Sequence, residues 1–253
     1  MDQEAPLTGQ SAVITGASDG IGKAAARHIA AAGANVVLAA RREQKLQELA
    51  VSIEEKTGVR TVVKPTDVSD RAAVDSLLSS AVEAFDGIDL IVANAGTGHE
   101  PGVDLEDISL EQYRTVMDVN IDGMFHTAQA GLPHLRASAG TLIFIGSFAG
   151  QYPRPNAPVY AASKWWTRGF ALSLSAAVGK DDVAISIINP SEVRTSFGKD
   201  FWDEDELLKH QFEAGEVTEP DAIAKAIVFA ARQDSPDMIS ELDLYRRDKF
   251  RGF

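Results

Sequence analysis

The chain has 253 residues, of which 45% are hydrophobic and 24% charged, and its 24 Lys and Arg against 37 Asp and Glu give a net charge of −13. This balance is typical of a folded globular protein, and we expect a single domain over residues 1–253. The acidic excess argues against nucleic acid as a partner, because phosphate binding needs a basic face. The sequence contains no cysteine, which excludes disulfides and thiolate chemistry.

Two further properties concern the surroundings of the protein. No apolar run reaches the roughly 18 residues of a membrane span, and the first residues lack the basic start and apolar run of a secretory signal. We therefore expect a cytoplasmic protein with no membrane contact. Lysines are few, and acids cluster at residues 104–112 and 200–206. This pattern indicates either an ordinary acidic surface or an adaptation to high salt.

Short β-branched apolar runs alternate with helical patterns along the chain. The predicted strands are Ser11–Thr15, Asn35–Ala39, Arg60–Lys64, Leu90–Ala93, Thr141–Ile145, Ala184–Ile188 and Ile239–Leu244. Helical patterns lie between them, for example at Ile21–Ala32, Gln44–Thr57 and Arg71–Phe85. Near-continuous apolar strands separated by helices predict a parallel sheet covered on both faces. The expected fold is α/β: a single Rossmann-type doubly wound sheet of about seven strands.

Three later segments add detail. Residues Ser109–Leu135 form a long helical pattern that is interrupted by glycine and by Pro133. Glu219, near an N-cap, and Pro220 mark the start of another helix. Residues 194–217 are irregular and carry aromatic side chains. Since ligands bind beyond the carboxyl ends of the strands, this segment is either a flap over a substrate or an ordinary surface insertion.

A glycine-rich loop follows the first predicted strand. Its spacing is GxxxGxG, and a helical pattern starts within it. Such a loop lets the backbone approach a pyrophosphate, while the helix N-terminus offers N–H groups and a positive dipole end. The expected cofactor contacts in this loop are Gly16, Ser18, Asp19, Gly20, Ile21 and Gly22.

The end of the second strand indicates which dinucleotide binds. An acid there would bind the ribose 2′-hydroxyl of NAD, but Ala40 occupies that position and Arg41 and Arg42 follow. Guanidinium groups match phosphate oxygens, which favours NADP(H) over NAD(H), with Arg41 as the main contact and Ser18 as a helper. Asp19 slightly disfavours this choice, and the alternative is that both arginines cap an exposed loop.

Two more segments fit a cofactor cleft. Asp67 and Val68 follow the third strand, where Asp67 could hold the adenine amino group. Asn94, Ala95 and Gly96 follow the fourth strand and would let the backbone pass close to a ribose. The alternatives are a helix N-cap at Asp67 or Ser69 and a plain turn at Asn94–Gly96.

The order of these motifs, together with Asn120, Ser147, Tyr160-x3-Lys164 and the segment from Pro190 to Thr195, resembles the short-chain dehydrogenase/reductase family of the classical type. The resemblance runs from about Leu7 to Leu244. It implies that Tyr160 is the general acid/base, with a pKa of about 10 when free that the Lys164 cation would lower.

The resemblance also implies roles for the neighbouring residues. Lys164 would bind the nicotinamide ribose, Ser147 the substrate oxygen, and Asn120 a water that links Lys164 to solvent. Further cofactor contacts would come from Tyr160 and from Pro190, Ser191, Val193 and Thr195. The family usually has glycine where this chain has Ser191, and its Asn-Asn-Ala-Gly is here Ala93-Asn94-Ala95-Gly96.

The substrate is the least defined part of the prediction. Candidate pocket residues are apolar with a few polar groups, which suits a small alcohol or carbonyl compound; they are Thr97, His99, Phe148, Tyr152, Pro153, Ser191, Phe201 and Trp202. One alternative is a 3-oxoacyl thioester on acyl carrier protein, although that carrier is acidic and needs a basic patch. Another is a non-catalytic NADP-sensing protein. By resemblance we expect a homo-oligomer, a tetramer or a dimer, that pairs through Ser109–Leu135 and the helix carrying Tyr160.

Overall fold

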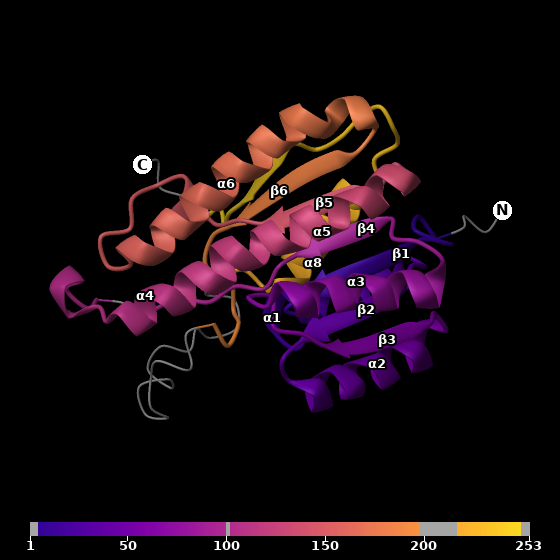
Figure 1. Ribbon diagram of the computed structural model, residues 1–253, viewed down its shortest axis with the longest axis horizontal. Helices are drawn as coiled ribbons and strands as arrows, with labels where there is room; N and C mark the ends of the chain where they lie inside the picture. Colours follow the sequence, from indigo (N-terminus) through magenta and orange to yellow (C-terminus); the bar gives the residue numbers. More distant parts are fainter. Residues whose placement is uncertain (1–4, 100–101, 198–216, 249–253) are drawn as a thin grey trace.

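Seven parallel strands form one sheet at the centre of the described part of the molecule (Figure 1). The computed structural model describes residues 5–99, 102–197 and 217–248. Its strands are β1 (Ser11–Thr15), β2 (Asn35–Ala40), β3 (Thr61–Pro65), β4 (Leu90–Ala93), β5 (Thr141–Ile145), β6 (Ala184–Pro190) and β7 (Glu241–Leu244). They lie in the order β3-β2-β1-β4-β5-β6-β7, and every neighbouring pair is parallel. The predicted doubly wound α/β fold is confirmed.

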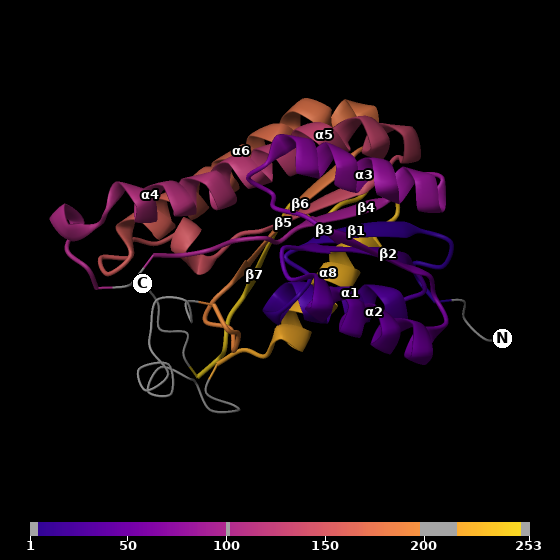
Figure 2. The same cartoon turned by 60° about the horizontal axis from the view of Figure 1, so that its bottom comes forward.

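Helices cover both faces of this sheet (Figure 2). One face carries α1 (Gly20–Ala31), α2 (Glu43–Thr57) and α8 (Pro220–Ala231), and the other carries α3 (Arg71–Phe85), α4 (Leu110–Met117), α5 (Gly123–Ser138) and α6 (Pro158–Val178). Successive residues of a strand enter different cores: Ile14 packs in the cluster of Ile29, whereas Val13 packs in the cluster of Leu77. Burial on both faces is the reason that the strands read as continuous apolar runs.

The order of the strands in the sheet indicates where a ligand can bind. Strands β2 and β3 lie on one side of β1, while β4 to β7 lie on the other. In open parallel sheets the crevice at such a switch point, beyond the carboxyl ends of the strands, receives ligands. The segments after β1, β2, β3, β4, β5 and β6 all emerge at this edge.

The long helical pattern predicted over Ser109–Leu135 is interrupted at Asp118–Asp122 and not at Pro133. The segment comprises α4, a π-helical turn η2 (Asp118–Asp122) and most of α5. The Ser109 hydroxyl accepts a hydrogen bond from the Gln112 N–H, and the Gln112 side chain accepts one from the Ser109 N–H. Pro133 lies inside α5 and does not end it. The π turn rotates the chain so that Asn120 points inward and is fully buried.

Helix starts follow the expected chemistry with one correction. Pro220 is at the first turn of α8 directly after Glu219. The N-cap of α3 is Asp70, whose carboxylate accepts from the N–H groups of Ala72 and Ala73. The alternative of an N-cap at Asp67 or Ser69 is therefore wrong. Short 3₁₀ turns complete the described elements at η1 (Leu105–Asp107), η3 (Phe148–Gly150) and η4 (Gly179–Asp181).

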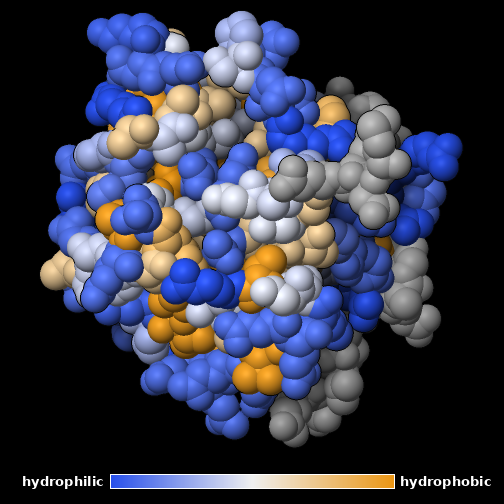
Figure 3. Space-filling view, turned by 90° about the vertical axis from the view of Figure 1, so that its right-hand side faces the viewer, coloured by the Kyte–Doolittle hydropathy of each residue, from blue (hydrophilic) through white to orange (hydrophobic). Residues whose placement is uncertain are grey.

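The surface is predominantly hydrophilic where Figure 3 views it, and its hydrophobic residues form small separate groups. This appearance agrees with the acidic composition and the net charge of −13. Among the described helices, none combines the length and the apolar character that a membrane span requires.

Candidate active site

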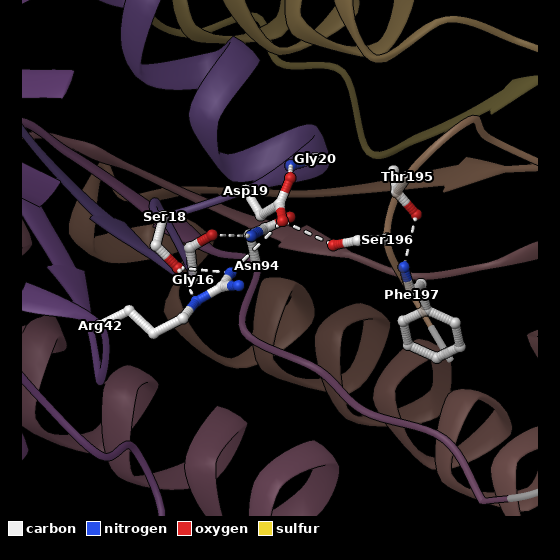
Figure 4. Close-up of polar contacts among 9 residues, drawn as sticks. All are labelled: Gly16, Ser18, Asp19, Gly20, Arg42, Asn94, Thr195, Ser196 and Phe197. Atoms are coloured by element: carbon white, nitrogen blue, oxygen red, sulfur yellow. Dashed lines mark hydrogen bonds and ion pairs between the residues drawn. The ribbon is translucent and has the colours of Figure 1, made fainter. Parts of the chain in front are cut away.

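The glycine-rich loop between β1 and α1 packs against Asn94 at the end of β4 (Figure 4). Gly16 has a φ of +67° and Gly20 a φ of +51°, which glycine adopts without strain. A Cβ on Gly22 would lie 2.3 Å from the Gly16 oxygen and 2.5 Å from Asn94 Nδ2. Asn94 Nδ2 donates to the Thr15 oxygen at 2.9 Å. The glycines thus permit close packing that holds the loop at the switch point.

Arg42, rather than Arg41, reaches this loop. Its Nη2 donates to Ser18 Oγ at 2.9 Å and lies 3.5 Å from Asp19 Oδ2, whereas Arg41 is exposed. Asp19 also caps α1 by accepting from the Gly20 N–H at 2.8 Å. Burial raises the pKa of Asp19, but the hydrogen bonds from Ser196 and Gly20 and the Arg42 charge outweigh it, so the pKa lies below its ordinary value. The carboxylate is therefore ionised and partly neutralised by Arg42.

The third strand delivers Asp67 and Val68 to the same edge. Asp67 Oδ1 accepts from the Ser69 N–H at 3.0 Å and from the Ser69 hydroxyl at 2.7 Å. Burial raises the pKa of Asp67, yet these bonds and the Arg41 charge bring it below the ordinary value. Val68 is buried, and a Cβ on Gly123 would lie 2.6 Å from its Cγ2. Asp67 keeps a second carboxylate oxygen for another donor.

Asn120 fastens three parts of the site together. Its Nδ2 donates to the Thr97 oxygen and to Ser163 Oγ, both at 2.9 Å, and its Oδ1 accepts from the Thr97 N–H at 2.8 Å. The π turn, the loop after β4 and α6 are thereby joined. The same Oδ1 is 3.5 Å from the position of a Cβ on Gly96, and Lys164 Nζ is 3.7 Å from it. Gly96, Asn120 and Lys164 therefore lie beside one another.

Ser147, Tyr160 and Lys164 meet between β5 and α6. Ser147 caps η3 by accepting from the Ala149 N–H at 3.1 Å, and its side chain hydrogen-bonds Tyr160. Lys164 is 4% exposed, lies with its Nζ 5.8 Å from the Tyr160 ring centroid, and donates to the Ile145 oxygen at 3.0 Å. The three side chains therefore lie close to one another beyond the carboxyl end of β5.

Burial is the largest influence on the pKa values of Lys164 and Tyr160. It lowers the pKa of Lys164 from 10.5 to about 8. It raises the pKa of Tyr160, while hydrogen bonding with Ser147 and the Arg154 charge act in the opposite direction. The sequence predicts that Lys164 lowers the Tyr160 pKa. In the structure the two lowering influences come instead from Ser147 and Arg154, because the Lys164 ammonium is turned to the Ile145 carbonyl.

The segment after β6 closes over both halves of the site. Ser196 Oγ donates to Asp19 Oδ2 at 2.6 Å, and the Phe197 ring centroid is 5.5 Å from that of Tyr160 (Figure 4 shows Ser196 and Phe197). Thr195 Cγ2 would lie 2.9 Å from a Cβ on Gly20. We call residues 194–197 the stem. The predicted flap over 194–217 includes this stem, and its remainder at 198–216, with Phe201 and Trp202, lies outside the described residues.

A polar network anchors the loop that follows Ser147. Gln151 Nε2 donates to Glu241 Oε1 at 3.1 Å and to Asp243 Oδ1 at 2.8 Å, and its oxygen accepts from Tyr245 at 2.7 Å. Glu241 also forms a paired ion contact with Arg168 of α6, with Nε at 2.6 Å and Nη2 at 2.9 Å. These contacts join β7, α6 and the η3 loop.

The other predicted residues occupy several positions. Pro190 ends β6 and is buried, the half-buried Ser191 donates its N–H to the Leu244 oxygen at 3.1 Å, and Val193 bridges to Thr218. His99 is 4% exposed, so it is buried within its loop. Ile21 is partly buried against the core, and Ala95 donates its N–H to Thr15 Oγ1.

Four contributors to the site were not singled out from the sequence. Thr15 Oγ1 accepts from the Asn94 N–H at 3.0 Å. The only sequence signal for this role was the position of Thr15 directly before Gly16, the first glycine of the loop. Ser163, Ser196 and Arg154 have no motif of their own. In the described part of the chain, no group of three or more His, Asp or Glu side chains is placed to hold a metal ion.

A parallel sheet with a glycine-rich loop at its switch point and a serine, a tyrosine and a lysine at the same edge is typical of nucleotide-dependent oxidoreductases. The chain belongs to the short-chain dehydrogenase family, whose sequence model matches residues 10–206. It is 36% identical over 187 residues to sulfoacetaldehyde reductase 2 of Chromohalobacter salexigens, and the alignment covers 73% of each chain.

Two solved structures show how far the likeness extends in space. The alcohol dehydrogenase of the archaeon Thermococcus sibiricus, complexed with 5-hydroxy-NADP, matches with a TM-score of 0.87 at 28% identity over 96% of this chain and 99% of that one. The closed form of a serine dehydrogenase complexed with NADP⁺ matches with a TM-score of 0.88 at 26% identity over 96% of this chain and 98% of that one. The fold is thus shared over nearly the full length of these enzymes.

Proposed function

We propose that this chain is an NADP(H)-dependent oxidoreductase that interconverts a secondary alcohol and a ketone or aldehyde. The observation that carries the proposal is the meeting of Ser147, Tyr160 and Lys164 at the edge where Arg42 and Ser18 also lie. The relatives support the reaction class, because their names describe an alcohol dehydrogenase, a serine dehydrogenase and an aldehyde reductase.

The donors at the edge fit NADP(H). The α1 N-terminus and its glycines suit a pyrophosphate, and Arg42 with Ser18 provides a guanidinium and a hydroxyl for a 2′-phosphate. Arg42 replaces Arg41 as the proposed main contact, since Arg41 is exposed and acts on Asp67 instead. Two of the solved relatives are complexed with NADP⁺ or a derivative of it. Bound NADP(H) supplies the hydride in reduction and accepts it in oxidation.

The residues of the chain handle the proton. In reduction the Tyr160 hydroxyl donates its proton to the substrate oxygen, which becomes the alcohol oxygen as the hydride reaches the carbon. Ser147 donates a hydrogen bond to the same oxygen and stabilises its developing negative charge. In oxidation both steps reverse, and Tyr160 accepts the proton. The phenolate that remains after donation is stabilised by the hydrogen bond with Ser147.

Asn120 has a supporting role in this scheme. Both hydrogens of Nδ2 are given to protein acceptors, so only Oδ1 has a lone pair left for a water beside Lys164. We propose that this oxygen orients such a water for proton exchange with solvent. The side chain also fixes the loop after β4 relative to α6, so its loss would disturb geometry as well as proton exchange.

The substitution Tyr160→Phe tests the function. It removes the acid/base hydroxyl and keeps the ring, so turnover of any carbonyl substrate with NADPH should fall by about 10²–10⁴-fold, while NADPH binding stays near normal. Nicotinamide absorbance measures turnover, and fluorescence titration measures binding. Tyr113→Phe is the matched control, because Tyr113 lies exposed on α4. Near-normal turnover of Tyr160→Phe would contradict the proposed mechanism.

The alternatives are separated by the choice of substrate. A panel of small alcohols, ketones and aldehydes is compared with a 3-oxoacyl thioester. Turnover restricted to the thioester would favour a reductase of acyl carrier substrates. Cofactor binding without turnover of any compound would favour a sensing protein.

A further inference from the structure

Arg154 has no function in the scheme above, yet it lies beside the reacting tyrosine. Its guanidinium carbon is 5.2 Å from the ring centroid of Phe148, the residue directly after Ser147. Its positive charge acts on the Tyr160 hydroxyl, where it lowers the pKa. Arg154 is half-buried and belongs to the segment that joins η3, which Ser147 caps, to α6, which carries Tyr160.

The charge of Arg154 is not matched by a carboxylate in the part of the chain that the structure describes. Arg42, Arg136, Arg168 and others there are ion-paired, but no ion pair involves Arg154. Other arginines of the described residues, such as Arg41, Arg60 and Arg114, also form no ion pair, so the feature that distinguishes Arg154 is its place beside Phe148 and Tyr160. A guanidinium that stacks on an aromatic ring keeps its N–H groups free for a planar anion.

The surroundings of Arg154 favour a small ligand. The Phe148 ring also contacts Tyr152, with centroids 5.2 Å apart, and Tyr245, with centroids 6.2 Å apart. These rings hold Phe148, and Phe148 in turn supports the guanidinium. The cation is therefore presented by a packed aromatic group rather than by a free surface side chain.

We propose that Arg154 binds an anionic group of the substrate, and that the substrate class is a small carbonyl or hydroxy compound bearing a carboxylate or sulfonate. This inference rests on the proposed function, since it adds the substrate class to the same site. Arg154 would hold the anionic end of the molecule, while Ser147 and Tyr160 bind the oxygen that changes oxidation state. In reduction the carbonyl carbon gains the hydride and its oxygen gains the Tyr160 proton, and the anionic group is unchanged.

The test compares acids with their uncharged esters. Acetoacetate and levulinate are assayed with NADPH beside methyl acetoacetate and methyl levulinate, in wild type and in Arg154→Gln. Wild type should prefer the acids, and Arg154→Gln should lower kcat/KM for the acids by about 10- to 100-fold, mainly through KM, because a charge-assisted hydrogen-bonded pair is lost. The esters should change by less than about threefold, and Arg154→Lys should restore part of the preference because it keeps the charge.

Arg60→Gln is the matched control. Arg60 lies over the Phe85 ring at 5.1 Å, a similar stacking contact, but it is exposed and precedes β3 at the opposite edge of the sheet. Its substitution should leave both acids and esters unchanged. Equal losses for acids and esters in Arg154→Gln would show an effect through Tyr160 alone and would overturn the inference. A wild type that prefers the esters would overturn it as well.

A binding measurement separates this inference from the proposed function. Calorimetric titration of the NADPH-loaded protein with levulinate needs no turnover. Binding that is lost in Arg154→Gln, without reduction of any compound, would refute the proposed function and keep the anion site. Turnover of esters together with equal levulinate binding in both proteins would keep the function and refute the anion site.

Discussion

Replacing Lys164 by methionine should stabilise the cofactor-free protein at neutral pH. Lys164 is 4% exposed, and burial lowers its pKa from 10.5 to about 8. Each tenfold change in proton affinity corresponds to about 1.4 kcal/mol, so holding the ammonium in the fold costs about 3 kcal/mol. The hydrogen bond to the Ile145 oxygen offsets about 1 kcal/mol of this. Methionine has a similar volume, and the expected net gain is about 2 kcal/mol.

The sign of this effect should depend on pH. Between about pH 8 and 10.5 the unfolded chain binds the Lys164 proton and the folded chain does not, so wild-type stability rises with pH in this window. Below about pH 8 both states are protonated and the full cost is present. Above 10.5 both are neutral and only the hydrogen bond remains, so wild type should then be the more stable by about 1 kcal/mol.

Urea denaturation of cofactor-free wild type and Lys164→Met at pH 7 and pH 10 measures the difference directly. Other titrating groups are common to both proteins and cancel in the comparison. Lys225→Met serves as the control because Lys225 is exposed on α8. A variant that is less stable than wild type at pH 7, or a difference that is the same at both pH values, would refute the reasoning.

Three other predictions concern the cofactor and the surface. Arg42→Ala should raise KM for NADPH by about 10- to 100-fold and leave KM for NADH nearly unchanged, whereas Arg41→Ala should have a small effect; the reverse ranking would assign the phosphate to Arg41. Gly22→Ala should destabilise the protein by about 1–3 kcal/mol and weaken cofactor binding, because its Cβ would lie 2.3 Å from the Gly16 oxygen. Gly87→Ala is the control, since a Cβ on Gly87 meets nothing within 4 Å; thermal melting compares the two. If the net charge of −13 is an adaptation to salt, stability and activity should rise with KCl, and full activity in dilute buffer would exclude that explanation.

The sheet was predictable because each strand is buried on both faces and so appears as an apolar run. Three of the seven strands, among them β4 (Leu90–Ala93), match the predicted bounds at both ends, and the others differ by up to two residues at one or both ends. The helix over Ser109–Leu135 was less predictable, because the π turn at Asp118–Asp122 changes the periodicity by a single residue. Asn120 was the available signal, since asparagine is unfavourable inside a helix.

The positions of site residues were predictable to the level of the segment and not of the side chain. Arg41 and Arg42 are equivalent in the sequence, but only Arg42 turns to Ser18. Contacts between distant segments, such as that of Ser196 with Asp19, depend on where β6 delivers its loop. Arg154 could not be identified because its significance comes from Phe148 and Tyr160 and not from a motif.

The network that anchors the Ser147 loop has a consequence for synthesis of the protein. Gln151 is held by Glu241 and Asp243, which belong to β7, the last strand in the described residues. A nascent chain that has emerged only as far as β6 carries Asn120, the Ser147 hydroxyl and α6, but lacks the strand that fixes the loop between them. The loop after Ser147 is therefore anchored only once β7, one of the last segments to be synthesised, has added itself to the sheet.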